Sequence, residues 1–243
     1  MKTVLTIAGS DPSGGAGIQA DLTTFSAFNV KGLSAVTAVT AQEPGAVKGV
    51  FPVPPSFVVQ QIETLARAYT IDAVKLGMLA KRETVTALSE LLRRLNLTNV
   101  VLDPLLVSTS GFPLLEEEGI PALKELLPRV LIVTPNLHEA SVLTGMEVAS
   151  EGDMREAAKR FREMGTRYAL IKGGHLTGKA VDILHEGEGV KRYVSERIGK
   201  ELHGTGCVLS AAIAACLAEG IGVTRAVERA KVYITNLIKR RGI

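Results

Sequence analysis

Short apolar runs alternate with amphipathic segments along almost the whole chain. Apolar runs of about four to eight residues are typical of strands, and apolar positions that recur every three or four residues are typical of helices. Several of the runs are apolar on both faces, so they predict a parallel sheet covered by helices on both sides. The expected strands are 3–8, 35–40, 73–76, 100–103, 131–134 and 169–172, and the expected helices are 16–29, 56–69, 83–95, 121–127, 137–144, 153–164, 207–219 and 224–240.

One segment breaks this alternation. Residues 181–185 and 190–194 flank Glu-Gly-Glu-Gly, which predicts a hairpin and a weak candidate for a lid. Asp153 is expected to cap the helix that it begins, and Gly165 to follow that helix. No linker-like composition and no internal repeat divide the chain, so residues 1–243 are predicted to form a single α/β domain.

Composition narrows the class of protein without changing this picture. The 243 residues are 46% hydrophobic and 22% charged, as is ordinary for a globular enzyme. The net charge of +3 is too small to indicate nucleic-acid binding, and no apolar run reaches the roughly 18 residues of a membrane span. On one helix Cys207 and Cys216 would lie about 13.5 Å apart, too far for a disulfide. A reducing, cytoplasmic location is expected.

The most informative motif joins a glycine loop directly to a helix of small and apolar residues, in the order His203, Gly204, Thr205, Gly206 and Cys207. Glycines let backbone N–H groups turn toward a ligand, and a helix N-terminus carries partial positive charge, so the loop is expected to bind an anion. A thiol at a helix entrance is expected to have a lowered pKa. A loop that can bind phosphate next to a thiol that can act as a base indicates phosphoryl transfer. A small buried hydrophobe is the alternative for Cys207, and it is the expectation for Cys216.

A second glycine loop, residues 9–17, follows the first expected strand and opens a helix. Ligands of open α/β sheets bind at this edge. The loop is not a Walker A motif, because Gly15 stands where the lysine is required, and the alternative is a tight connection. Asp21, one turn inside the helix, is either a substrate ligand or an exposed helix residue.

Polar side chains also end other expected strands. The amide of Gln42 suits a ring nitrogen beside an amino group, unless it is a plain loop residue. Asp103 and Glu139, which follow neighbouring strands, can hold Mg²⁺, although Asn136 and Glu139 also fit a helix capping box. Lys172 is either a phosphate contact or part of a strand-end turn. The histidines do not have the spacing of a zinc site.

These motifs resemble those of the hydroxymethylpyrimidine/phosphomethylpyrimidine kinases of the ribokinase-like superfamily, which act in thiamine biosynthesis. The resemblance runs in order from residue 3 to about residue 240. It is carried by GSDPSGGAGIQAD at 9–21, TAVTAQ at 37–42, KLGML at 75–79, Asp103-Pro104, TPN at 134–136 with Glu139, KGGH at 172–175 and HGTGC at 203–207.

The resemblance implies a three-layer α/β/α fold, a homodimer, and two successive phosphorylations by MgATP, first of a hydroxymethyl aminopyrimidine and then of its monophosphate. Cys207 takes the position that sugar kinases of the superfamily fill with an aspartate base. By position, the resemblance implies an anion hole and catalytic group at Gly204, Thr205, Gly206 and Cys207, substrate contacts from Gln42, Asp21, Gly9 and Met78, ATP or phosphate contacts from Lys172, Asn136 and His203, and magnesium ligands Asp103 and Glu139.

One departure and three alternatives accompany this prediction. Residues 107–112 lack a lysine that commonly precedes Ser-Gly there, so that lysine contact to phosphate is missing. A pyridoxal or pyridoxine kinase also carries a cysteine loop. A non-catalytic pyrimidine sensor would not need Asp103, Glu139 and Cys207 together, and a sugar kinase would need an aspartate in place of Cys207.

Overall fold

The computed structural model describes residues 1–174, 180–187, 189–195 and 204–241. In these residues nine strands form one sheet in the order β3-β2-β1-β4-β5-β6-β7-β8-β9. The six strands from β2 to β7 run parallel, while β3, β8 and β9 run antiparallel to their neighbours. The strands are β1 (Thr3–Ser10), β2 (Lys31–Glu43), β3 (Ala46–Pro52), β4 (Ala73–Leu76), β5 (Val100–Leu102), β6 (Ile132–Val133), β7 (Tyr168–Gly173), β8 (Ala180–Glu186) and β9 (Gly189–Ser195).

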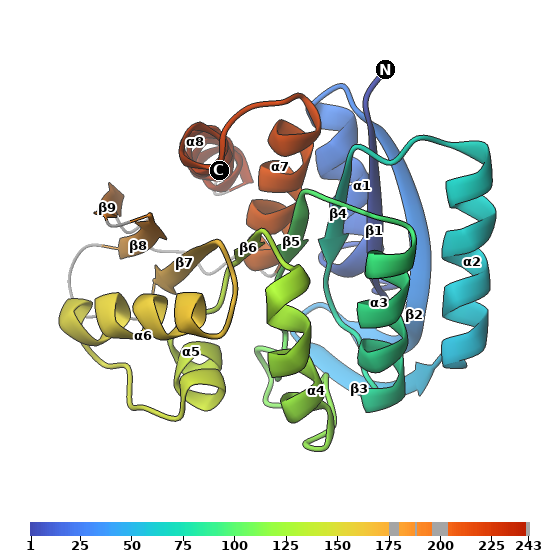
Figure 1. The fold of residues 1–243 in the computed structure, drawn as a ribbon, viewed down its shortest axis with the longest axis horizontal. Coiled ribbons are helices and arrows are strands. Elements are labelled where there is room, and N and C mark those ends of the chain that lie inside the picture. Colours follow the sequence, from blue (N-terminus) through green and yellow to red (C-terminus); the bar gives the residue numbers. More distant parts are fainter. Residues whose placement is uncertain (175–179, 188, 196–203, 242–243) are drawn as a thin grey trace.

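Helices cover both faces of the sheet, so the predicted three-layer α/β/α architecture is confirmed. Figure 1 shows α7 and α8 on one side of the strands and α4, α5 and α6 on the other. The helices are α1 (Gly17–Ala27), α2 (Pro55–Ala68), α3 (Arg82–Arg94), α4 (Gly119–Leu126) with a short 3₁₀ turn (Leu127–Arg129), α5 (Leu137–Thr144), α6 (Glu151–Glu163), α7 (Thr205–Ala218) and α8 (Val223–Arg241).

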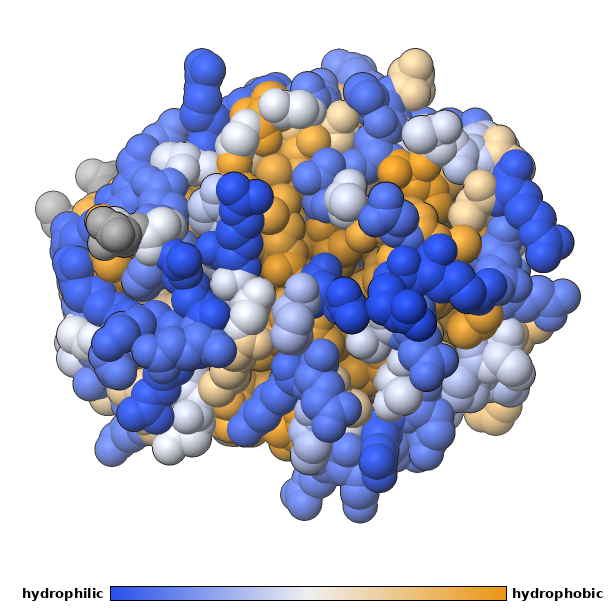
Figure 2. All heavy atoms as spheres, in the orientation of Figure 1, coloured by the Kyte–Doolittle hydropathy of each residue, from blue (hydrophilic) through white to orange (hydrophobic). Residues whose placement is uncertain are grey.

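Two separate apolar cores follow from the two-residue period of the strands. In β4, Val74 and Leu76 pack with residues of α2 to α6, whereas Ala73 packs with α1, α7 and α8. The face of the molecule shown in Figure 2 is largely hydrophilic, and apolar side chains are visible between the polar ones. No helix in the described part of the chain is long and apolar enough to cross a bilayer.

The same period places buried polar side chains on the face that α1 and α7 cover. Alternation puts Lys75 on the side of Ala73, and Asp103 on the side of Val101. Thr6, the direct partner of Lys75 on β1, and Thr134 extend this set on neighbouring strands. We call the five residues of this set, within β1 and at the carboxyl ends of β4, β5, β6 and β7, the polar row: Thr6, Lys75, Asp103, Thr134 and Lys172.

The structure corrects three expectations about elements. Strand β3, which the sequence did not predict, pairs antiparallel with a β2 that extends to Glu43. Helix α6 is capped by Ser150, and Asp153 is instead the third residue of its capping box. The turn between β8 and β9 lies beside Tyr168, the first residue of β7, because Glu186 pairs with it. That turn is at the amino edge of the parallel strands, so the lid prediction for it is wrong.

Candidate active site

The two glycine loops meet at the carboxyl edge of the sheet. Gly204 precedes α7 with a φ of 82°, and a Cβ atom built on it would lie 2.0 Å from the carbonyl oxygen of Gly15. Only glycine fits so close an approach in this backbone conformation. Segments about 190 residues apart in the sequence therefore pack backbone against backbone.

Among the described residues, the N-cap residues of α1 and α7, Ala16 and Gly204, supply no side-chain cap at this edge. The Ala16 amide nevertheless donates to the Asp11 carboxylate, and the Gly17 amide donates to the Cys207 sulfur. Helix α5 differs, because Asn136 accepts a 2.8 Å bond from the Glu139 amide and Glu139 accepts one of 2.8 Å from the Asn136 amide. The capping prediction for this pair is confirmed. Uncapped helix N-termini that face one place form a natural anion site.

Charged members of the polar row lie directly beside α7. The ammonium group of Lys172 donates a 2.9 Å hydrogen bond to Asp103, and a Cβ added at Gly206 would lie 3.3 Å from the same nitrogen. Ser210 on α7 also approaches the Asp103 carboxylate, at 3.5 Å. The glycine at 206 thus allows the start of α7 to lie close to the Lys172–Asp103 pair.

Glu139 is buried beside this ion pair. The pKa of its carboxyl is raised to about 7, mainly by burial; Lys172 lowers this pKa and the negative charge of Asp103 raises it, and both effects are included in that value. Glu139 is 2% exposed. Among the described residues no cluster of three or more His, Cys, Asp or Glu side chains forms a ready cage for a metal ion. Two facing carboxyl groups still fit Mg²⁺, which usually takes one or two protein carboxylates and completes its shell with phosphates and water.

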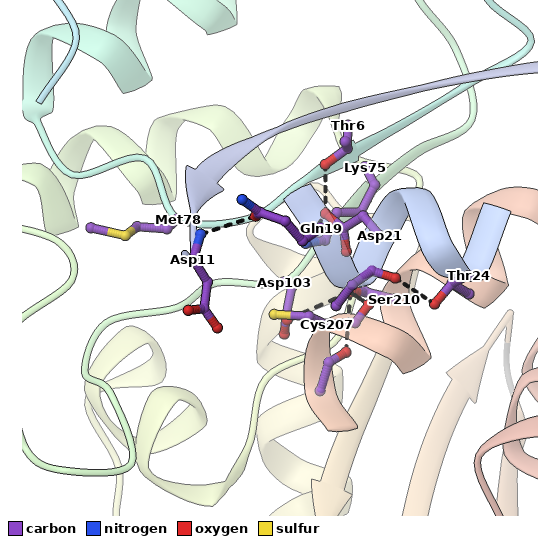
Figure 3. Close-up of polar contacts among 12 residues, drawn as sticks. Thr6, Asp11, Gln19, Asp21, Thr24, Lys75, Met78, Asp103, Cys207 and Ser210 are labelled. Carbon is purple, nitrogen blue, oxygen red and sulfur yellow. Dashed lines mark hydrogen bonds and ion pairs between the residues drawn. The ribbon is translucent and has the colours of Figure 1, made fainter. Parts of the chain in front are cut away.

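Cys207 occupies the first turn of α7, where the sulfur accepts a hydrogen bond from the Gly17 amide. Burial raises the pKa of this thiol to about 11, with smaller contributions from Asp103 and Asp21, while Lys75 lowers it. The expectation of a lowered pKa is therefore wrong, because removal of water outweighs the helix N-terminus. The sulfur nevertheless faces charged groups (Figure 3), unlike that of Cys216, which is fully buried in the apolar core. Both thiols are free, as expected.

Behind Cys207 lies an ion pair that the sequence analysis missed. Lys75 and Asp21 both have fully buried side chains and approach within 2.8 Å, and Thr6 donates a 2.6 Å bond to the same carboxylate oxygen. The reading of Asp21 as an exposed helix residue is wrong. Since Thr6 and Lys75 hold its carboxylate, Asp21 does not point freely into a substrate space. One feature of the sequence could have revealed this ion pair: Lys75 lies inside a strand that is predicted to be buried on both faces.

The expected substrate residues gather at the start of the first glycine loop. A Cβ at Gly9 would lie 2.9 Å from the sulfur of Met78, so these two residues are in contact. Gln42 lies half-buried near the tip of the β2–β3 hairpin and accepts a 3.2 Å hydrogen bond from Thr40. Thr40 also donates to the Ser10 carbonyl, which joins this hairpin to the glycine loop. His203 lies outside the described residues.

One groove lies away from these residues. It has a volume of about 510 Å³ and is lined by residues of the α1 end and of α8, among them Phe28, Arg229 and Tyr233. It contains none of the expected site residues.

A comparison with known families identifies the family of the chain. A family model described as phosphomethylpyrimidine kinase matches residues 11–242. The chain belongs to the phosphomethylpyrimidine kinase family. A hydroxymethylpyrimidine/phosphomethylpyrimidine kinase of Rhizobium meliloti is 46% identical over 95% of this chain and 88% of its own length. The thiamine biosynthesis bifunctional protein ThiED of Geobacter sulfurreducens is 45% identical over 98% of this chain, which spans about half (49%) of that longer relative.

The chain is also similar to solved kinase structures in its three-dimensional fold. The ADP complex of Bacillus subtilis pyridoxal kinase matches with a TM-score of 0.89 and 41% identity, over 97% of this chain and 90% of that one. The predicted kinase fold is thereby confirmed.

Proposed function

We propose that this chain transfers the γ-phosphoryl group of ATP to the hydroxymethyl group of 4-amino-5-hydroxymethyl-2-methylpyrimidine, and then to the resulting monophosphate, as a step of thiamine biosynthesis. The observation that carries the proposal is the convergence of the uncapped α1 and α7 N-termini around Cys207, beside the Lys172–Asp103 pair. Phosphoryl transfer needs mainly positioning and neutralisation of charge, which this arrangement offers.

Each group has a proposed role. The amides of Gly204, Thr205, Gly206 and Cys207 form the anion hole for the transferred phosphoryl group. Lys172, with Asn136 and His203, contacts the ATP phosphates. Asp103 and Glu139 hold Mg²⁺, which when bound neutralises charge on the phosphate oxygens. Gln42 binds the aminopyrimidine, and Gly9 and Met78 line the space for its ring. Asp21 acts only indirectly, because its carboxylate is bound to Lys75.

Product analysis tests the proposed activity directly. The purified protein is incubated with MgATP and the hydroxymethylpyrimidine, and the products are separated by ion-exchange chromatography. We expect the monophosphate to appear first and the diphosphate later, with ADP formed in step with both. Absence of both phosphates would reject the proposal, and binding of the pyrimidine without turnover would favour the sensor alternative.

Cys207 is proposed to orient the substrate hydroxyl group and to accept its proton. The monophosphate is already ionised when it attacks, so the second phosphorylation needs no such group. We expect Cys207→Ala to lower kcat for the alcohol by about 100-fold, the lower range for a general base, and to change kcat for the monophosphate much less. An equally small loss on both substrates would eliminate the proton-accepting role.

Pyridoxal phosphorylation is a second candidate function, favoured by the 41% identity to the Bacillus subtilis pyridoxal kinase. Both substrates carry a hydroxymethyl group on a heteroaromatic ring. A competition assay with both substrates in one mixture gives the ratio of their kcat/KM values. We expect the pyrimidine to be preferred, and a ratio in favour of pyridoxal would reverse the assignment.

A homodimer through the β2–β3 hairpin is also proposed. Val39 and Phe51 pair directly across the two strands, so their side chains share one face, and they are 46% and 70% exposed. Phe57 at the start of α2 is another exposed aromatic residue, at 53%. We expect Phe51→Ser to shift the protein toward monomers in analytical ultracentrifugation. Val232→Ser, which alters a similarly exposed residue (62%) on α8, is the matched control. The cytoplasmic location stays a prediction.

A further inference from the structure

Ala80 has a backbone conformation that alanine rarely adopts. Its φ is 63°, and the other three non-glycine residues with positive φ in the described part of the chain are all asparagines, which tolerate this region better. The Lys81 amide donates a 2.8 Å hydrogen bond to the Leu79 carbonyl oxygen, two residues earlier. A bond of that span across a residue with positive φ defines the rare, strained form of the γ-turn. Strain of this kind clusters at functional sites.

Contacts from the segment that precedes α4 hold this turn in place. Leu115 forms an isolated bridge with Ala80, and the Glu116 amide donates a 3.1 Å hydrogen bond to the Ala80 carbonyl oxygen. The Glu116 carboxylate accepts a 2.8 Å bond from the Arg82 amide and a 2.6 Å bond from the Lys81 ammonium group. The turn is therefore held by several independent contacts, as a strained backbone requires.

The side chain of Ala80 gives a reason for alanine rather than glycine in this turn. A glycine would adopt the same conformation without strain. Ala80, however, is only 8% exposed, and it packs with Met78 and Ala38 in a small apolar cluster that is separate from the two main cores. Val50 of β3 and Leu105 pack against this cluster from outside. The methyl group of Ala80 is thus part of the apolar surface that supports Met78.

Met78 is an expected substrate contact, and its side chain depends on this support. A Cβ on Gly9 would lie 2.9 Å from the Met78 sulfur, so the thioether lies against the end of β1 (Figure 3). Thr37 donates a 2.5 Å hydrogen bond to the Met78 carbonyl oxygen, which fixes the backbone of that residue. The methionine side chain itself has three rotatable bonds and readily fills any free space. Its position therefore depends on the residues packed behind it.

We propose that Ala80 is a positioning residue that determines which ring the site accepts: its methyl group keeps Met78 against Gly9 and so limits the width of the space for the substrate ring. The inference rests on the proposed function, in which Gly9 and Met78 line that space. A space of fixed width favours the hydroxymethylpyrimidine over pyridoxal, because the pyridoxal ring carries one more substituent. The strain at Ala80 is the cost of a methyl group at a position that glycine would occupy without strain.

Ala80→Gly removes the methyl group and relieves the strain at once. We expect the ratio of kcat/KM for the pyrimidine to kcat/KM for pyridoxal to fall about tenfold, the lower end of the effect of one methylene group in a pocket. The midpoint of chemical denaturation should change little, because relief of strain opposes the lost packing and the greater freedom of an unfolded glycine. Ala226→Gly removes a fully buried methyl group from α8, so it should lower that midpoint and leave the substrate ratio unchanged.

A second measurement uses no substrate. NMR relaxation of protein labelled with ¹³C at the methionine ε-methyl groups gives an order parameter for each methyl group, and Met78→Leu identifies the Met78 signal. Met154, which has no exposure, is a fixed reference, and Met1, which is 95% exposed, is a mobile one. We expect the order parameter of Met78 to lie near that of Met154 in the wild type, and to move toward that of Met1 in Ala80→Gly.

The proposal is overturned if Ala80→Gly leaves the Met78 order parameter unchanged, or if the substrate ratio stays constant or rises. An equal fall of the ratio in Ala226→Gly would also overturn it, since any lost methyl group would then have the same effect. If the wild-type protein phosphorylates neither compound, the proposed function is wrong. The ratio of the two dissociation constants, measured by calorimetry, then replaces the kinetic ratio and decides the role of Ala80.

Discussion

Replacing Gly204 with alanine tests whether contact between the two glycine loops creates the site. The substitution has two separable effects. A residue with a side chain at a φ of 82° costs about 1–2 kcal/mol of backbone strain. In addition, the new Cβ would lie 2.0 Å from the Gly15 carbonyl oxygen, whereas ordinary contacts begin near 3.4 Å, so the loops must separate by more than 1 Å.

Gly220 supplies a matched control. Its φ is 80°, but nothing lies within 4 Å of a Cβ built there, and it follows the far end of α7. Gly220→Ala should therefore show the strain of about 1–2 kcal/mol alone. Chemical denaturation would measure this loss in both variants, and it should be larger in Gly204→Ala.

Activity then separates the two variants. A misplacement of about 1 Å near reacting atoms costs about 100-fold in rate. We expect Gly204→Ala to lower kcat/KM for the pyrimidine by about that factor, and Gly220→Ala to keep the wild-type value. If Gly204→Ala retains full activity, or if Gly220→Ala loses as much, the contact between the loops does not shape the anion site.

Three further predictions concern single side chains. Glu139 has a folded-state pKa raised to about 7, so it stabilises the fold most below its unfolded value, and this contribution is lost as the pH rises toward 7. In EDTA, Glu139→Gln should flatten the fall in unfolding free energy between about pH 4.5 and 7; an unchanged slope would assign that fall to other groups. Ser150→Ala should lower the unfolding free energy by about 1 kcal/mol without changing kcat, because it removes the cap of α6. Asp103→Asn should raise the Mg²⁺ concentration needed for half-maximal activity, and an unchanged magnesium titration would exclude Asp103 as a ligand.

The arrangement of the site could be predicted from the sequence wherever strand ends determine it. Parallel strands present their carboxyl ends at one edge, so the spacing of apolar runs placed Asp103, Asn136 and Lys172 together. Strand β3 was missed because Gly49 interrupts a short apolar run that reads as a turn. Its pairing with β2 is a contact between strands, which local periodicity does not record.

The error over Cys207 has a different cause. The sequence shows that the thiol stands at a helix start, which favours the thiolate, but it does not show how much protein covers the sulfur. Burial proved to be the larger effect. Lys75 was overlooked for a related reason, since the sequence places a lysine in a buried strand but does not show which partner the buried ammonium group has.

The charges of the polar row suggest why the site has two ion pairs in place of one. Lys172 holds Asp103, and Lys75 holds Asp21. If Lys172 contacts an ATP phosphate and Asp103 binds Mg²⁺, as proposed, then a phosphate that attracts Lys172 would free Asp103 for the metal ion, and we expect binding of the two ligands to favour each other. The Lys75–Asp21 pair has no exposed surface through which a phosphate could disturb it. The partly exposed pair is therefore the one that a bound phosphate can rearrange, whereas the fully buried pair keeps its partners.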